Sequence, residues 1–467
     1  MPKIRVLIEL DQPQPEAFTR HAAALESSME AFRQNESAAQ RLAGLGVEII
    51  GDCPPVPLFH ERVVRGSDST PGFEAFAAPV TNPDTAASSV VLRGEVEPNR
   101  LNDLKARPGV RVYPDSRLTL FPAAAPMPGD VSEHVDCPPF QPAVDARTVR
   151  ELLGVGPLFQ AGYRGQGVVV GILDEGIDGS IYPVLGGFVR SNAQLPGQGR
   201  ITSHGSMCAA DVLVAAPGAT LLDYPFLGIP DSGGALGMFQ AVLEQRRKDG
   251  TPHVVSNSYG FVGVPPKESN PNHEIFDLNH PLHRKIREVV ASGAAVFFAA
   301  GNCGSPCPSG KCVPSGVGPG KSIHGSNSLN EVITIAAVNS YGNRVGYSSI
   351  GPGMFEPQKP DLSAYTHFFG NFGPNRPGGQ SASPYDNGTS AACPVAAGVA
   401  ALLLSVFGPL DPDLLKKGLL ESAWNPDGRS GWNPETGYGV LNALSAYAKI
   451  AEKLAEPPGP EGNNAPR

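Results

Sequence analysis

The chain has 467 residues, of which 41% are hydrophobic and 17% are charged, and its formal net charge is −9. This length predicts roughly two to four globular domains, and the acidic balance argues against a nucleic-acid partner. Charged residues interrupt the N-terminal strand-like run before a hydrophobic signal core forms, and no uninterrupted apolar run is long enough to span a membrane. We therefore expect a cytoplasmic protein with no membrane partner, although export by another route stays open.

The N-terminal part of the chain, residues 1–121, predicts a small α+β module. Its apolar residues alternate where strands are expected and recur at helical spacing where helices are expected. The expected elements are strands at 3–10, 46–50, 88–96 and 110–113, and helices at 15–45 and 98–106. This β-α-β-β-α-β order is typical of a ferredoxin-like module.

A linker, a large α/β region and a tail follow this module. Residues 122–144 are rich in proline and alanine with little periodicity, which is typical of a linker. Residues 145–452 alternate strand and helix patterns, which predicts a doubly wound, mostly parallel sheet with helices on both faces. Residues 453–467 combine proline, glycine and asparagine, and we expect a disordered tail.

Four polar residues stand at the ends of apolar elements in the α/β region. Asp174 ends a buried-strand run, His204 precedes a small-residue helix, and Asn302 follows another apolar strand. Ser390 lies in a Gly-Thr-Ser turn before an apolar helix, where free backbone N–H groups favour developing negative charge. Such strand ends are where α/β folds collect their chemistry, and the order Asp, His, Ser is one of the three known for hydrolytic triads.

The segments around these residues resemble the motif blocks of the subtilisin-like serine proteases, or subtilases. The matching blocks are Asp-Glu-Gly at 174–176, His-Gly-Ser-Met at 204–207, Ala-Ala-Gly-Asn at 299–302 and Gly-Thr-Ser-Ala-Ala at 388–392. With weaker blocks between them, the resemblance covers about residues 145–450. Glu175, Met207 and Ala391 depart from the family pattern, but none is a triad or oxyanion position, so they concern substrate geometry rather than chemistry.

The resemblance implies a subtilisin-like fold and a serine endopeptidase. Ser390 would attack the scissile carbonyl, His204 would carry its proton, and Asp174 would orient the imidazole. Asn302 would donate a hydrogen bond to the oxyanion, together with the backbone N–H of Ser390. A catalytically silent peptide-binding scaffold is the alternative from another class, and the four intact residues argue against it. A narrow processing enzyme for one partner peptide is a third hypothesis.

An extended peptide or protein is the expected substrate. Ser258, Tyr259 and Gly260 would form an edge segment that pairs with the substrate backbone by β-augmentation. Ala300 and Gly301 would help to wall the pocket for the side chain that precedes the scissile bond. A role in the core is an equal alternative for Tyr259.

Subtilases often carry a module like residues 1–121 as a propeptide. The resemblance therefore implies intramolecular inhibition, with residues 118–121 running into the cleft as a product-like strand and self-cleavage between about residues 116 and 145. An ordinary accessory domain without an inhibitory role is the alternative.

Three cysteines, Cys303, Cys307 and Cys312, follow Asn302 within ten residues. They could bind zinc with a fourth ligand such as His324, but their spacing is not a standard zinc pattern. Two of them could instead form a disulfide, although the odd total of seven cysteines gives no paired framework. We expect no metal and no cofactor; calcium sites occur in many subtilases, but none maps to an acidic loop here.

Overall fold

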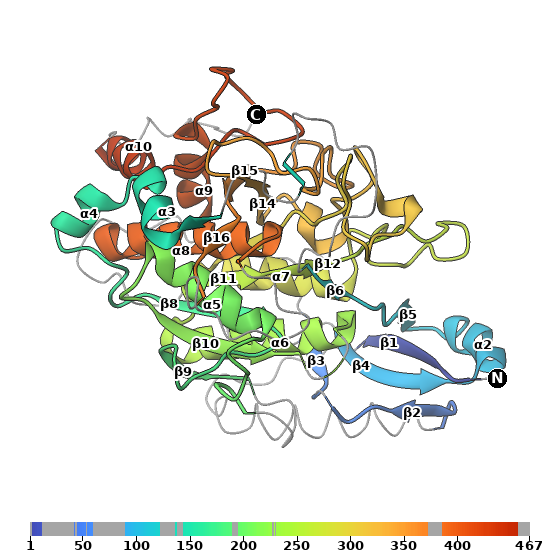
Figure 1. The fold of residues 1–467 in the computed structure, drawn as a ribbon. Coiled ribbons are helices and arrows are strands. Elements are labelled where there is room, and N and C mark those ends of the chain that lie inside the picture. The colour runs from blue at the N-terminus through green and yellow to red at the C-terminus, as the bar shows by residue number, and fades with distance from the viewer. Residues whose placement is uncertain are drawn as a thin grey trace, which may run out of the picture.

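The computed structural model describes most of the chain, and its elements are shown in Figure 1. The described residues are 2–11, 42, 44–52, 54–58, 89–121, 136–137, 143–188, 195–226, 228, 230–371 and 385–455. Most of the expected first helix, of the linker 122–144 and of the tail 453–467 lies outside the described residues.

A seven-stranded sheet forms the centre of the molecule, with the strand order β15-β14-β13-β11-β8-β10-β9. Its strands are β8 (Val169–Asp174), β9 (Val184–Gly187), β10 (Thr220–Pro225), β11 (Val254–Asn257), β13 (Ala295–Ala299), β14 (Ile333–Val338) and β15 (Leu362–Tyr365). All of the pairings between these strands are parallel. The predicted α/β sheet is therefore confirmed.

Helices cover both faces of this sheet, because neighbouring strand residues point to opposite faces. Phe297 of β13 packs in the core beneath α5 and α8, whereas Phe298 packs in the core beneath α6 and α7. The helices are α3 (Ala146–Leu153), α4 (Gly156–Gln160), α5 (His204–Ala215), α6 (Ser232–Asp249), α7 (Pro281–Ala291), α8 (Thr389–Phe407), α9 (Pro412–Glu421) and α10 (Ala443–Ala455).

Helix α8 packs closely against α5 because it is built largely from small residues. A Cβ added at Gly398 would lie 2.2 Å from the carbonyl oxygen of Val212, so only glycine allows this approach. Among the described residues, α8 alone has the length and apolar composition of a membrane span, but 83% of that stretch is buried within the protein. Its composition therefore reflects a central core position.

The N-terminal residues form a separate antiparallel sheet with the order β2-β4-β1-β5, and β3 pairs with β4. Its elements are β1 (Ile4–Asp11), β2 (Val47–Ile49), β3 (Val56–Leu58), β4 (Ser89–Val96), η1 (Pro98–Arg100), α2 (Leu101–Lys105) and β5 (Val110–Pro114). Strand β3 was not expected from the sequence. Because most of the first expected helix lies outside the described residues, the complete ferredoxin-like module stays a prediction.

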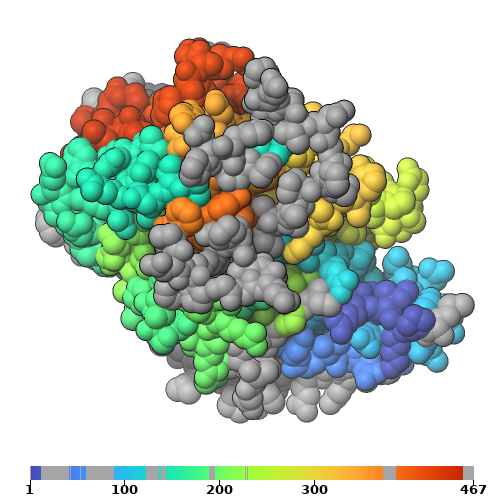
Figure 2. Space-filling model, viewed as in Figure 1, coloured from blue at the N-terminus to red at the C-terminus, as the bar shows by residue number. Residues whose placement is uncertain are grey.

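The N-terminal sheet packs against the large region through one of its faces. Val6 and Ile8 of β1 lie in the sheet's own core, whereas Leu7 and Tyr113 join the core beneath α6 and α7. Figure 1 places this sheet, in blue, beside α6 and α7 and far from the C-terminal helices, and Figure 2 shows it as a lobe against the rest of the molecule. The chain then runs from β5 into the large region as the short strand β6 (Thr119–Leu120), which pairs antiparallel with β12 (Tyr259–Gly260). A second short pair joins β7 (Val144–Asp145) to β16 (Phe368–Phe369) in parallel.

Candidate active site

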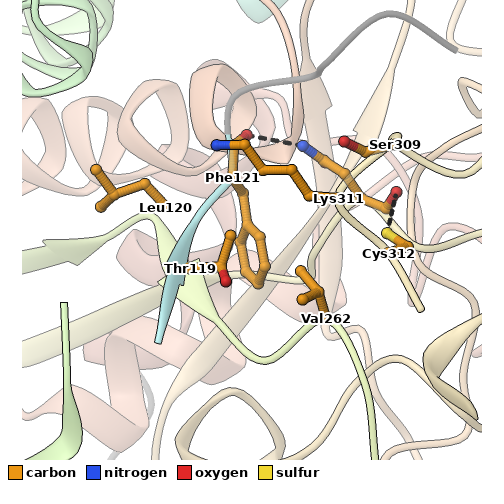
Figure 3. A pocket seen from close by; sticks show the side chains of 8 residues that line it. Thr119, Leu120, Phe121, Val262, Ser309, Lys311 and Cys312 are labelled. Atoms are coloured by element: carbon orange, nitrogen blue, oxygen red, sulfur yellow. Dashed lines mark hydrogen bonds between the residues drawn. The ribbon is translucent and has the colours of Figure 1, made fainter. Parts of the chain in front are cut away.

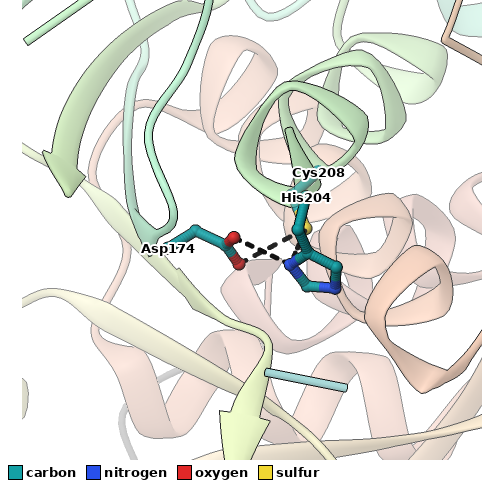
Figure 4. A group of neighbouring side chains, drawn as sticks. All are labelled: Asp174, His204 and Cys208. Atoms are coloured by element: carbon teal, nitrogen blue, oxygen red, sulfur yellow. Dashed lines mark hydrogen bonds and ion pairs between the residues drawn. The ribbon is translucent and has the colours of Figure 1, made fainter. Parts of the chain in front are cut away.

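Asp174 and His204 are brought together by the end of β8 and the start of α5 (Figure 4). The Oδ1 atom of Asp174 lies 2.7 Å from Nδ1 of His204, and both side chains are buried. Ser203 caps α5 by accepting a hydrogen bond from the backbone N–H of Ser206, which fixes where the helix begins. The pair thus has the geometry of a carboxylate that orients an imidazole.

Glu175, which departs from the family pattern, has a structural part in this arrangement. Its Oε2 atom accepts a hydrogen bond of 3.0 Å from the backbone N–H of His204. This places a carboxylate at the N-terminus of α5, where unpaired N–H groups favour negative charge. The sequence pattern gave no signal for this contact, because the usual residue at that position is a threonine or serine.

Ser390 lies in the first turn of α8 and is fully buried. Gly388 precedes the helix with a φ of +83°, in the left-handed region that favours glycine. The Ser390 hydroxyl donates a 2.7 Å hydrogen bond to the carbonyl oxygen of Phe121. Nε2 of His204 is buried and has no hydrogen-bond partner in the part of the chain that the structure describes. The hydroxyl is therefore turned toward Phe121 rather than toward the imidazole.

Asn302 also contacts this carbonyl oxygen. Its Nδ2 atom donates a 2.7 Å hydrogen bond to Phe121 (Figure 3). Its Oδ1 atom accepts hydrogen bonds from the backbone N–H and the hydroxyl of Thr389, both at 2.9 Å, and this fixes which way the amide points. A distance of about 2.7–3.1 Å between donor and oxygen is what an oxyanion hole requires.

The segment that ends at Phe121 lies in the cleft as an extended strand. Leu120 pairs with Tyr259, Thr119 pairs with Gly260, and the N–H of Phe121 donates a 3.0 Å hydrogen bond to the carbonyl of Ser258. The structure thus gives the 258–260 segment the strand-pairing geometry expected from the sequence. The side chain of Tyr259 is nonetheless fully buried against Phe226 and Phe298, so its core alternative also holds.

The ring of Phe121 lies close to two glycines, and the residue is 3% exposed. A Cβ added at Gly260 would lie 2.7 Å from Cζ of Phe121, and one added at Gly301 would lie 3.4 Å from the same atom. Gly301 also has a φ of +102°. Ala300 packs instead in a small cluster with Ile323 and Ala336. Of the two expected wall residues, Gly301 alone makes this close contact.

Two disulfides lie beside the site, and they correct the cysteine interpretation. Cys303 pairs with Cys312, and Cys307 pairs with Cys137, which is 170 residues earlier in the chain. The alternative of a zinc site formed by these cysteines is therefore excluded, and the expectation that no paired framework exists was wrong. The backbone N–H of Ser309 in this loop donates a 2.8 Å hydrogen bond to the carbonyl of Asn302. The disulfide-closed loop thus supports the residue that contacts Phe121.

A buried thiol, Cys208, lies next to the Asp174–His204 pair (Figure 4). Its Sγ atom is 3.7 Å from Oδ2 of Asp174, and the three side chains are close enough together to hold a metal ion. Burial, reinforced by Asp174, raises the pKa of this thiol well above its usual range. A protonated thiol and a carboxylate already bonded to the imidazole fit a hydrolytic pair better than a metal centre.

The pocket around Phe121 is lined by the strand segment and by the disulfide-closed loop (Figure 3). Its lining residues are Thr119, Leu120, Phe121, Val262, Asn302, Ser309, Lys311 and Cys312. The sequence predicted residues 118–121 in the cleft, and the structure brings Phe121 to Ser390 and Asn302. Thr389 and Cys137 are the site components that motif analysis did not place in these contacts.

Comparisons with known proteins show which family this chain belongs to. Residues 165–439 match the sequence model of the subtilase family. Subtilisin DY of Bacillus licheniformis is 30% identical over 279 residues, which cover 56% of this chain and 86% of that protein. A calcium-dependent protease of Nostoc sp. is 27% identical over 359 residues, which cover 64% of this chain. The match covers only 48% of that relative, so the chain spans about half of its length.

The fold is also similar to a solved structure. Fervidolysin from Fervidobacterium pennivorans, a keratinolytic enzyme related to subtilisin, superimposes with a TM-score of 0.55. The match covers 96% of this chain and 61% of that chain at 17% identity. At this identity the likeness concerns the fold alone.

Proposed function

This chain belongs to the subtilase family, and from that premise we propose that it is a serine endopeptidase. Asp174, His204 and Ser390 form its triad, and Asn302 forms its oxyanion hole. One observation carries the proposal. The carbonyl oxygen of Phe121 receives hydrogen bonds of 2.7 Å from both the Ser390 hydroxyl and the Asn302 amide, where a substrate carbonyl would lie.

The reaction follows from these positions. Ser390 Oγ forms a bond to the substrate carbonyl carbon while its proton passes to Nε2 of His204. Asp174 stabilises the imidazolium through its 2.7 Å contact with Nδ1. Asn302 donates to the oxygen as it gains negative charge. His204 then gives the proton to the leaving nitrogen, and water releases the acyl group in the same way.

The chain's own segment supports a substrate preference. Phe121 and Leu118 are each 3% exposed, so the residue before the scissile bond and the residue three positions earlier lie in apolar surroundings. The proposed substrate is an extended peptide with an aromatic residue before the scissile bond and a leucine three positions earlier.

Residues 1–121 act as an intramolecular inhibitor in this proposal. Their last residues occupy the cleft by the backbone pairing that a substrate would use, and the alternative of a plain accessory domain gives no reason for this placement. We retain the expectation that no cofactor is needed, and no calcium site is proposed.

The two disulfides bear on where the protein folds. Disulfides form and persist in oxidising compartments and are rare in the cytosol. In place of the cytoplasmic expectation, the proposed location is therefore an oxidising compartment. Isolation of the protein with four free thiols at these positions would contradict this.

A fluorophosphonate probe tests the enzyme proposal directly. The full-length chain and its Phe121→Gly variant, which lacks the ring that anchors the segment, should both be labelled on Ser390, the variant faster. Ser390→Ala should abolish labelling, and mass spectrometry should locate the probe. The proposal would be contradicted if neither of the two chains that keep Ser390 were labelled after prolonged incubation. It would also be contradicted if Ser390→Ala were labelled as strongly as those chains.

A further inference from the structure

Residues 386–388, called the nucleophile turn below, lead into Ser390 and are held by side chains from outside α8. The N–H of Gly388 donates a 2.9 Å hydrogen bond to the hydroxyl oxygen of Tyr347. The carbonyl of Gly388 accepts a 3.0 Å hydrogen bond from the hydroxyl of Thr366, and both side chains are buried. Because glycine rotates more freely than any other residue, these two bonds hold Gly388 at the φ of +83° from which α8 begins.

A histidine next to Tyr347 accounts for the direction of this hydroxyl. Nε2 of His367 lies 2.7 Å from the hydroxyl oxygen of Tyr347. That oxygen accepts the hydrogen bond from Gly388, so its own hydrogen is left for Nε2, and the ring hydrogen is then on Nδ1. Burial raises the pKa of Tyr347 well above its usual range, so the hydroxyl keeps its proton.

Asp136 lies near the other nitrogen of the same imidazole. Its Oδ2 atom is 3.7 Å from Nδ1 of His367, and both residues are buried. A carboxylate at this nitrogen favours a proton on Nδ1, which is the tautomer that leaves Nε2 free to accept. The next residue, Cys137, is joined by a disulfide to Cys307, which ties Asp136 to the large region. Asp136, His367 and Tyr347 thus form a chain that ends at the nucleophile turn.

The backbone of His367 has an unusual conformation. Its φ is +63°, and among the described residues it is the only one other than glycine with a positive φ. Such conformations are uncommon, are held in place by the surrounding structure and cluster at functional sites. The N–H of His367 donates a 3.0 Å hydrogen bond to the carbonyl of Asp386, while the ring reaches Tyr347. His367 therefore supports the nucleophile turn through its backbone and, by way of Tyr347, through its side chain.

Resting on the proposed function, we infer that Asp136, His367 and Tyr347 are positioning residues for the nucleophile. They fix the nucleophile turn and, through it, the first turn of α8, which carries the hydroxyl and the backbone N–H of Ser390. None of the three lines the pocket around Phe121. Small displacements of reacting groups lower the rate of the chemical step. Loss of this chain of contacts should therefore lower kcat and leave KM nearly unchanged.

The first test removes one hydroxyl from the Phe121→Gly chain. Tyr347→Phe leaves the buried N–H of Gly388 without its partner. Tyr365→Phe is the matched control, because it removes a buried hydroxyl that has no hydrogen-bond partner in the part of the chain that the structure describes. Tyr347→Phe should lower kcat for the peptide Leu-Thr-Leu-Phe-Ala-Ala, and the rate of fluorophosphonate labelling, about tenfold, which corresponds to about 1.4 kcal/mol. KM should stay within about twofold of the parent chain, and Tyr365→Phe should behave as the parent.

Two further measurements separate positioning from a loss of folded protein. The amount of label bound at completion counts the active molecules, so kcat is calculated per active molecule. Thr366→Val and Thr366→Ser repeat the comparison at the carbonyl of Gly388, since valine removes the hydroxyl and serine keeps it. We expect kcat to fall in Thr366→Val and to be largely restored in Thr366→Ser.

The second test asks whether His367 acts through Tyr347. His367→Gly removes the ring but keeps the backbone conformation accessible, because glycine adopts positive φ values freely. It should lower kcat about as much as Tyr347→Phe does. The double variant should lose little more than either single variant, because residues in one chain of contacts do not act additively.

The outcomes distinguish this inference from the proposed function. The inference would be overturned if Tyr347→Phe and Tyr365→Phe had equal kcat, if the loss appeared in KM alone, or if the two losses multiplied in the double variant. In each of these cases the parent chain would still cut the peptide, and the enzyme proposal would be unaffected. A parent chain that neither cut the peptide nor took up the label would instead overturn the proposed function.

Discussion

The Asp174–His204 pair and the segment 118–121 meet in the same cleft, but they are held there by different means. Asp174 and His204 belong to the ends of a buried strand and a buried helix, and their positions are set by the central core. The segment is held by short backbone pairing, one aromatic ring and ion pairs at the edge of the N-terminal sheet. The difference indicates that the arrangement of Asp174 and His204 persists when the N-terminal residues 1–121, called the cover below, are removed.

Removing the proposed oxyanion donor, Asn302, should lower activity and leave residues 118–121 in place. In the Phe121→Gly background, Asn302→Ala should lower kcat by about 10²–10³, a magnitude known for a subtilisin. Labelling of Ser390 by the fluorophosphonate probe should stay detectable, because the proposed triad is unchanged. Asn339→Ala, a change in an amide far along the sequence from the triad motifs, is the control. A turnover number equal to that of the control would remove Asn302 from the oxyanion hole.

A smaller effect is expected from filling the pocket that holds Phe121. The Cβ of Gly260→Ala would lie 2.7 Å from Cζ of Phe121, and overpacking of this kind costs about 1–3 kcal/mol, or roughly fivefold to 160-fold. The full-length chain should therefore become less inhibited, while peptides with phenylalanine before the scissile bond lose kcat/KM relative to peptides with alanine.

Gly156→Ala is the matched control for this change, because a Cβ there meets no atom within 4 Å. The activity of the full-length chain should rise while the preference for phenylalanine peptides falls. These opposite changes distinguish a filled pocket from general destabilisation of the protein. If inhibition and phenylalanine preference both stayed as in Gly156→Ala, Phe121 would not mark the pocket of the enzyme.

The parts of this comparison differ in how far the sequence could predict them. Asp174, His204, Asn302 and Ser390 stand in short local motifs at the ends of apolar runs, and the structure brings them to one place. The central parallel sheet was likewise predictable, because buried strands and helices alternate along residues 145–452. Local patterns sufficed wherever the relevant residues are neighbours in sequence.

The remaining features depend on contacts between residues far apart in sequence. The Cys137–Cys307 disulfide spans 170 residues, and nothing around Cys137 indicates its partner. Arg93 lies in an alternating strand where a charged residue would indicate a solvent-facing side, yet it is buried against Asp231. Glu175 differs from the family pattern, and its hydrogen bond to His204 depends on where α5 begins. Such contacts become visible only once the two regions are placed together.

The smallest predicted effect is a loosening of the cover by acid. Burial acts to raise the pKa of Glu9, but hydrogen bonds from Arg111 and Arg284 outweigh it and lower that pKa to about 2. Burial lowers the pKa of His280, which contacts the ring of Tyr113, to about 3. Undocking would remove the contact of His280 with Tyr113 and move the pKa of His280 toward its ordinary range. It would also remove Arg284 from Glu9 and raise the pKa of Glu9 in part, since Arg111 of the same sheet stays bonded to Glu9.

Both pKa shifts make docking of the N-terminal residues weaker at low pH. The undocked state takes up a proton on His280 below about pH 6.5, and on Glu9 at a higher pH than the docked state, whereas the docked state does not protonate these groups until about pH 3 and 2. Docking is therefore strongest above pH 6.5 and weakens as pH falls, by up to about tenfold per pH unit for each group in its window. Glu274, His283, His273 and Arg284 also act on His280, Glu274 opposing the lowered pKa and the others reinforcing it.

The measurement uses the inactive Ser390→Ala chain after an added protease has cut the linker. Retention of the N-terminal fragment on the remainder, followed by size-exclusion chromatography, should be nearly complete at pH 7.5 and should fall between pH 6.5 and 4.5. His280→Gln should flatten the curve in that range, and Glu9→Gln should remove the further loss below pH 4.5. If retention were equal at pH 7.5 and pH 4.5, these buried groups would not control docking. The same conclusion would follow if the His280→Gln curve had the slope of the unchanged chain. The cover would then be held by the Phe121 pocket and the β6–β12 pairing, and its removal would not respond to acid.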